Sequence, residues 1–204
     1  FSYVLNEWFE EAGVSHFIDW QGVEHMPSLD VTTACTASEQ QALDEELERL
    51  RPRADATQVL LRRPESRPNT RAALLALERI KGLYPEKFDA VRGQLFRALW
   101  RDGKDIGASE VIAELFPGLE VGVEQSSSEE VHALEKTTEA WRATGHNRLP
   151  LAISNRTGTP YKGLGERLEL TKFLREELGP SLMLGEDSKA KDLTQYLREQ
   201  HLIR

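Results

Sequence analysis

The most reactive side chain in the sequence is its single cysteine, Cys35. It lies in a stretch of small and polar residues, 32–36, that precedes a predicted helix, where the helix dipole can acidify a thiol. No histidine or lysine stands beside it in the sequence. One cysteine excludes an internal disulfide, a zinc finger and a complete C-x-x-C pair within these residues. We therefore expect Cys35 to be a partly buried structural thiol that activity does not require.

The histidines and glycines also lack the spacing of known sites. The histidines stand at positions 16, 25, 132, 146 and 201, and no pair of them has a ligand spacing such as H-E-x-x-H. We therefore expect no metal site, and we expect His16 to be packed within a strand. Gly163 and Gly165 form a G-x-G without a third glycine, which is more typical of a strand-to-helix turn than of a phosphate loop.

Charge is unevenly distributed along the chain. Seven arginines fall within 49–71, and five acidic residues without a base fall within 37–48. Neighbouring blocks of opposite sign usually pair with each other or face solvent. The 204 residues carry 26 basic and 34 acidic side chains, a net charge of −8, which argues against nucleic-acid and anionic-membrane partners. No apolar run approaches the roughly 18 residues of a membrane span, and we expect a cytoplasmic protein.

Hydrophobic periodicity predicts mixed helices and strands in the first third of the chain. Apolar residues at 1, 4, 5, 8 and 9 form one helical stripe, and Gly13 suits its C-cap. A strand is predicted over 14–20, and a helix from a Ser38/Gln41 capping box to Arg51, before Pro52. A second strand is predicted over 58–62, followed by a surface loop over 64–68.

The middle of the chain is purely helical in pattern, and the end returns to strands. Four capped helical stripes are predicted, beginning near Asn69, Pro85, Ser109 and the Ser127/Glu130 capping box. A hairpin over 149–154 and 159–162 follows, and then helices over 166–178 and 189–201. The sequence thus predicts an α/β domain made of 1–67 and 146–204, interrupted by an all-helical insertion over 68–145.

Pro150 begins the apolar strand of this hairpin. Proline is tolerated at the first position of a strand, and by itself the trans bond is the default expectation. Five segments together carry a likeness to a known family. They are Phe1-Ser2-Tyr3, Pro64, Pro68-Asn69-Thr70, 95–106 (LFRALWRDGKDI) and 148–153 (RLPLAI). Over nearly its whole length the chain resembles the DsbA-like branch of the thioredoxin superfamily, which includes FrnE-type oxidoreductases, kappa-class glutathione transferases and hydroxychromene-carboxylate isomerases.

The resemblance implies a thioredoxin-like fold with an active-site motif, C-P-x-C-Y or S-P-x-S-Y, at the start of the first helix. Phe1, Ser2 and Tyr3 are similar to its last three positions, so Ser2 takes the place of the second cysteine. The nucleophile is then expected two positions before Phe1. The resemblance further implies a cis Pro150 that faces Ser2, with the backbone of Leu149 exposed to pair with a peptide or glutathione.

Three functions remain open on this basis. The first is a thiol–disulfide oxidoreductase of DsbA/FrnE type, favoured by the resemblance of 84–106 and 20–35 to that group. The second is a kappa-like glutathione-dependent transferase or isomerase, in which Glu166 would contact the γ-glutamyl group. The third is a redox-inactive binding module. We expect Ser2 and Pro150 in the catalytic site, Phe1, Tyr3, Leu149 and Glu166 in substrate binding, and no cofactor beyond glutathione as a co-substrate; the oligomeric state stays open, with a homodimer as one option.

Overall fold

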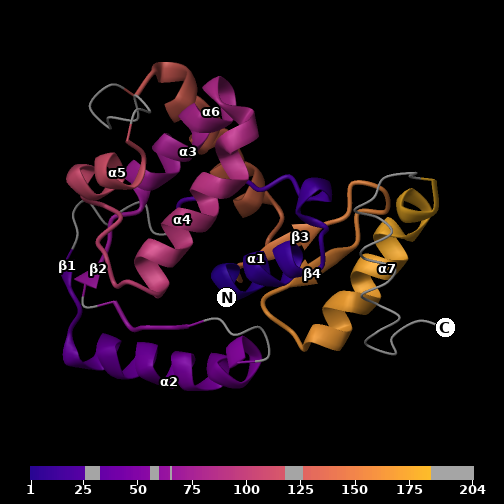
Figure 1. Cartoon of the computed structure of the whole chain (residues 1–204), viewed down its shortest axis with the longest axis horizontal. Helices are drawn as coiled ribbons and strands as arrows, with labels where there is room; N and C mark the ends of the chain where they lie inside the picture. Colours follow the sequence, from indigo (N-terminus) through magenta and orange to yellow (C-terminus); the bar gives the residue numbers. More distant parts are fainter. Residues whose placement is uncertain (26–32, 56–59, 65, 118–125, 185–204) are drawn as a thin grey trace. The chain divides into compact units, whose positions relative to one another are not determined.

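The computed structural model describes residues 1–25, 33–55, 60–64, 66–117 and 126–184 (Figure 1). The structure is mixed α/β and mostly helical. The chain divides into two compact units. The first, here called the hairpin unit, comprises Phe1–Asp19, Arg53–Val59 and Asn147–Arg204; the second, the helical unit, comprises Trp20–Pro52 and Leu60–His146. The helical unit therefore extends beyond the predicted insertion of 68–145 and takes in residues 20–52 and 60–67 as well.

The hairpin unit begins with helix α1 (Ser2–Glu11), as predicted. Its burial is wider than one stripe, because Tyr3 and Asn6 are buried together with the predicted positions 4, 5, 8 and 9, whereas Phe1 is half-buried. Gly13 ends the helix with a φ of 69°, and Val14 N–H donates to the Phe9 carbonyl at 3.0 Å. This left-handed glycine closes a Schellman-type C-cap, which confirms the predicted helix end.

The predicted strand over 14–20 is wrong. Ser15–Phe17 forms a 3₁₀ helix, η1, in which Phe17 N–H donates to the Val14 carbonyl at 2.9 Å. Its β-branched and aromatic residues suggested a strand, but a strand also needs a partner to complete its hydrogen bonds. Here the backbone bonds locally instead, and His16 is exposed rather than packed in a sheet.

The hairpin of this unit is present as predicted. Strands β3 (Leu151–Ile153) and β4 (Pro160–Lys162) pair antiparallel, with Ala152 opposite Tyr161. Helix α7 (Arg167–Leu184) follows and is longer than the predicted 166–178. The second closing helix, predicted over 189–201, lies outside the described residues.

The helical unit is built on α3 (Arg71–Leu83), α4 (Phe88–Trp100), α5 (Ser109–Leu115) and α6 (Ser128–Ala143), with the short η2 (Pro85–Lys87) before α4. Helices α3, α4 and α5 supply a common apolar core around Ile80, Leu95 and Ile112. The Ser127/Glu130 capping box at the start of α6 is present as predicted. Among the described residues of 70–145 there is no strand.

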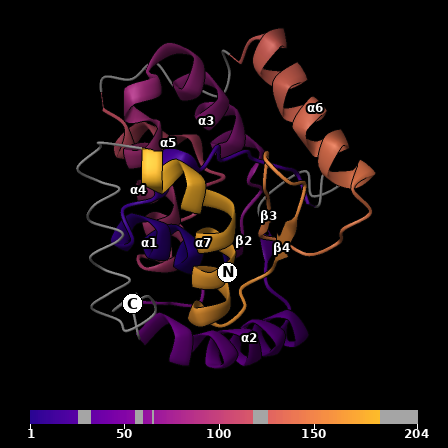
Figure 2. The same ribbon diagram turned by 90° about the vertical axis from the view of Figure 1, so that its right-hand side faces the viewer.

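Helix α2 (Ala37–Asp55) departs from its prediction at both ends. Its capping box is formed by Thr36 and Glu39, and not by Ser38 and Gln41. The Thr36 N–H donates to the Glu39 carboxylate, and the Glu39 N–H donates to the Thr36 hydroxyl. The helix also continues through Pro52. Figure 2 draws α2 as an unbroken ribbon. Proline leaves the Glu48 carbonyl without its helical donor, but both residues are exposed, so water can replace the lost bond.

Short pairings complete the helical unit. Strand β1 (Thr33–Ala34) pairs with β2 (Ser66–Arg67), where a surface loop was predicted. Of the predicted strand 58–62, Leu60, Leu61 and Arg62 are described and are not a strand. Across the described residues both sheets have two strands. The coarse α/β prediction is thus confirmed, and the described residues contain no larger central sheet.

Candidate active site

The residues predicted for the site fall in one unit. Phe1, Ser2 and Tyr3 lie at the start of α1, Leu149 and Pro150 lie just before β3, and Glu166 lies just before α7. All of these residues belong to the hairpin unit. Cys35 belongs to the helical unit, so the predicted site and the only cysteine are on different units.

The N-terminus of α1 is the positive end of the helix dipole. Phe1 is the N-cap, and its carbonyl accepts the Leu5 N–H at 3.0 Å. No side chain of the described residues caps this end, and its first turn contains no acidic residue. The positive end of the helix dipole is therefore not neutralised by a neighbouring carboxylate of that turn. Ser2 is half-buried and Tyr3 is buried at this end.

The peptide bond between Leu149 and Pro150 is cis, which confirms the prediction. Pro150 is buried, and its carbonyl accepts the Gly163 N–H at 2.7 Å. Gly163 has a φ of 68°, a conformation that glycine adopts without strain. This bond closes the open end of the hairpin directly at Pro150. The proximity of Pro150 to Ser2 stays a prediction.

Hydrogen bonding along β3 alternates between its two edges. Ser154 N–H donates to Thr159 across the turn, and Gly163 donates to Pro150 at the other end. In an antiparallel pair every second residue bonds to the partner, so Leu151 and Ile153 direct their backbone groups away from β4. Pro160 opposes Ile153 at such an outward position, and its missing N–H costs no bond between the strands. The edge that follows Leu149 and Pro150 therefore presents the backbone of Leu151 and Ile153.

Glu166 is already engaged within the chain. Its carboxylate is 2.8 Å from Nη2 of Arg53, and its N–H donates to the Glu169 carboxylate at 3.2 Å. The predicted γ-glutamyl contact would have to compete with both partners.

Tyr161 was missed by the sequence analysis. Its hydroxyl accepts the Gly165 N–H at 3.1 Å, and its ring lies 5.4 Å from that of Phe173 in α7. Burial of the side chain raises the pKa of Tyr161 above its ordinary value. The neutral phenol therefore ties the turn after β4 to α7. A single tyrosine in a three-residue strand has no sequence pattern that would indicate this role.

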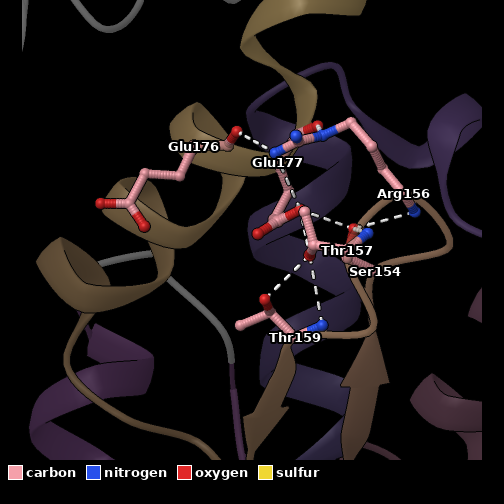
Figure 3. Close-up of polar contacts among 6 residues, drawn as sticks. All are labelled: Ser154, Arg156, Thr157, Thr159, Glu176 and Glu177. Carbon is pink, nitrogen blue, oxygen red and sulfur yellow. Dashed lines mark hydrogen bonds and ion pairs between the residues drawn. The ribbon is translucent and has the colours of Figure 1, made fainter.

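A denser group of polar contacts lies at the turn of the hairpin (Figure 3). The carboxylate of Glu177 in α7 accepts hydrogen bonds from Ser154 Oγ at 2.6 Å and Thr157 Oγ1 at 2.8 Å. Nη2 of Arg156 lies 3.2 Å from the same oxygen. These hydrogen bonds, that from Ser154 first, lower the pKa of Glu177 against the opposing effect of burial. The Glu177 carboxylate is thus negatively charged and contacts three side chains from the turn.

Cys35 has the surroundings of a packed side chain. It is buried, with 7% of its surface exposed, between β1 and α2. Its carbonyl accepts a hydrogen bond from Gln40 Nε2 at 3.2 Å. Among the described residues no group of three or more histidine, cysteine, aspartate or glutamate side chains could hold a metal ion.

The arginine-rich segment pairs with carboxylates, one of the two outcomes expected of it. Arg67 lies 2.7 Å from Glu39, and Arg63 lies 2.9 Å from Asp44, so both pairs join the basic segment to the acidic one. Arg71 pairs with Glu24, whose side chain is largely buried. Arg63, Arg67 and Arg71 are thus each paired with a carboxylate of the helical unit.

No protein-family model matches the chain, and no curated protein sequence matches it significantly. Within the part of the chain that the structure describes, no helix combines the length and apolar character needed to cross a bilayer.

Proposed function

We propose that this chain is a thiol–disulfide oxidoreductase of DsbA/FrnE type, in which the hairpin unit is the thioredoxin-like part. The observation that carries the proposal is the position of Leu149 and Pro150 at the start of the antiparallel hairpin, in the same unit as the Ser2 helix end. The proposed nucleophile is a cysteine two positions before Phe1, and Ser2 stands in place of the second motif cysteine.

The proposed chemistry follows from these positions. A thiol at a helix N-terminus is acidified by the helix dipole, and the Ser2 hydroxyl can donate a hydrogen bond to the thiolate. The thiolate attacks one sulfur of a disulfide, forms a mixed disulfide and releases the other sulfur as a thiolate. Ser2 cannot then resolve the mixed disulfide, so a second thiol from solution must displace the bound partner. Peptide disulfides and glutathione are the proposed partners, with no cofactor.

Ser2 and Tyr3 also favour a second candidate. They are similar to the last two residues of S-P-x-S-Y, the motif of the kappa-like glutathione transferases and isomerases. A serine two positions before Phe1 would support glutathione activation without a redox step. A residue with no nucleophilic group there would leave the binding module.

Two assays on the full-length protein distinguish these candidates. Insulin reduction driven by a dithiol tests the oxidoreductase, and glutathione conjugation tests the transferase. We expect turnover in the first assay and an acidic upstream thiol on titration. We also expect Pro150→Ala to damage substrate pairing more than folding. Activity in the conjugation assay alone would assign the kappa-like function. Silence of a folded protein in both would leave the binding module.

A matched control uses the thiol of Cys35. Cys35→Ser should leave the activity unchanged, because Cys35 is buried and belongs to the other unit. A large loss of activity in this variant would make Cys35 a catalytic thiol and overturn the proposed site.

A further inference from the structure

The turn of the β3–β4 hairpin is fixed to α7 through one carboxylate. Glu177 retains 9% exposure of its side chain, and a single oxygen, Oε2, accepts from Ser154, Thr157 and Arg156. Hydrogen bonds to a charged acceptor are about twice as strong as neutral ones. Ser154 also accepts the backbone N–H groups of Arg156 and Thr157, at 3.2 and 3.3 Å. Ser154 thus links the backbone of the turn to the Glu177 carboxylate.

Arg156 fixes the same turn to the backbone of α7. Its Nη2 donates to the Glu176 carbonyl at 2.8 Å, and its Nε donates to the Glu177 carbonyl at 3.3 Å. Pro180 follows four residues after Glu176 and has no N–H, so the Glu176 carbonyl lacks its ordinary helical donor. The guanidinium of Arg156 supplies that missing donor. Pro180 thus leaves the Glu176 carbonyl as an acceptor, and Arg156 of the turn donates to it.

The other end of the hairpin is fixed to the first half of α7 and to the loop before it. Tyr161 in β4 packs on Phe173 and accepts the Gly165 N–H, and Gly163 bonds to Pro150. The hairpin is therefore attached to α7 at its turn and at its open end, with Leu149 and Pro150 at the latter. Strands of three residues are too short to keep a fixed shape without such support.

We propose that Glu177 and Arg156 form a latch that positions the β3 edge, which begins at Leu149 and Pro150, to pair with the backbone of a bound peptide or glutathione. The inference rests on the proposed function, because it names residues that serve the same site. Glu177 and Arg156 are positioning residues, since neither touches the reacting sulfur. A fixed edge loses less conformational freedom when an extended ligand pairs with it. The latch should accordingly act on ligand binding and not on the reactivity of the nucleophile.

Hydrogen exchange in the full-length protein tests the latch directly. The informative amides are those of Ser154 and Gly158 at the turn and Gly163 at the open end, each with a hydrogen bond within the hairpin. Glu177→Gln keeps the shape of the side chain and removes its charge, and we expect all three amides to exchange about tenfold faster. The matched control is Glu176→Gln, because the carboxylate of Glu176 is turned away from the hairpin (Figure 3). It removes the same charge one residue away and should leave exchange unchanged.

Three results would overturn the latch. The first is unchanged exchange in Glu177→Gln, and the second is equal acceleration by both variants. The third is acceleration at Ser154 and Gly158 without Gly163, which would confine the effect to the turn. A double-mutant cycle adds Ser154→Ala, and the two substitutions should be strongly non-additive if they break the same contact. Additive effects would contradict it.

A kinetic measurement links the latch to ligand binding. Glu177→Gln should raise the KM for a peptide disulfide or glutathione disulfide several-fold, with kcat and alkylation of the nucleophile by iodoacetamide unchanged. A fall in kcat with KM unchanged would contradict positioning. A full-length protein that forms no mixed disulfide refutes the proposed function, whereas the exchange experiment still decides whether the hairpin is latched.

Discussion

The hairpin with α7 and the bundle of α3, α4 and α5 have different sources of order. In the bundle, buried apolar side chains from all three helices meet in one core, and Ile80 and Ile112 are almost fully enclosed. The strands of the hairpin contain no fully buried residue, and polar groups fix them to α7. Apolar burial tolerates small shifts, whereas a hydrogen bond to a carboxylate depends on distance and angle. The difference indicates that the bundle gives stability and the hairpin gives a defined local geometry.

The largest expected effect tests the apolar half of this comparison. Ile80→Ala removes a side chain with no exposed surface from the bundle core. We expect the free energy of unfolding in denaturant to fall by about 2–5 kcal/mol, from lost burial and the cavity left behind. Leu83→Ala, at the exposed end of α3, is the control and should change it by less than about 0.5 kcal/mol. Equal effects of the two would show that the core does not stabilise the bundle.

The next prediction concerns the largely buried ion pair of Arg79 and Glu130 in the helical unit. Glu130 lies 2.8 Å from Nε of Arg79 and also accepts the Ser127 N–H that caps α6. The bond from Arg79 first, and that from Ser127 as well, lower the pKa of Glu130 below its ordinary 4.5. A lowered folded-state pKa stabilises above the unfolded pKa, and this contribution disappears as the pH falls.

Glu130→Gln should therefore reduce stability by about 1–2 kcal/mol at pH 7. The difference from the wild type should shrink as the pH drops below about 4.5 and through the lower folded-state pKa, because the wild-type carboxylate then becomes protonated. Thermal unfolding across this range measures it. A difference that is constant with pH would show that charge is not its cause.

An effect of similar size tests the backbone at the open end of the hairpin. Gly163 has a φ of 68°, and a Cβ added at this position would have no atom within 4 Å. Gly163→Ala therefore adds backbone strain and no clash. We expect it to cost about 1–2 kcal/mol. Gly82→Ala, in α3 and also with free space, should instead stabilise by about 0.5 kcal/mol. The same sign for both substitutions would contradict the backbone assignment at Gly163.

The smallest effect is expected for exposed charge pairs. Asp44 and Arg63 are 2.9 Å apart, with 56% and 35% of their side chains exposed. Asp44→Asn should change the free energy of unfolding by less than about 0.5 kcal/mol, because solvent screens such pairs. A loss above 1 kcal/mol would mean that surface charge pairs rival the core in the helical unit.

Sequence periodicity predicted the parts of the fold that depend on local signals. The α1 stripe and its Gly13 cap, the Ser127/Glu130 box and the hairpin over 149–162 all appear as predicted. The predicted strand 14–20 failed because a strand depends on a distant partner. The end of α2 failed because Pro52 is exposed, and exposure is not visible in a local pattern.

The candidate site was predictable only where a family resemblance supplied the geometry. The cis bond at Pro150 followed from the resemblance and not from the propensity of its neighbours. Glu177 and Arg156 were missed because their contact joins segments about twenty residues apart. One signal was present in the sequence, since Pro180 leaves the Glu176 carbonyl in need of a donor.

The most direct test of the central claim is mass-spectrometric mapping of the mixed disulfide. The full-length protein is exposed to glutathione disulfide, digested and searched for the glutathionylated residue. The account predicts one modified cysteine, two positions before Phe1, and an unmodified Cys35, which is buried in the helical unit. Modification of Cys35 alone, or of neither position in a folded protein, would contradict it.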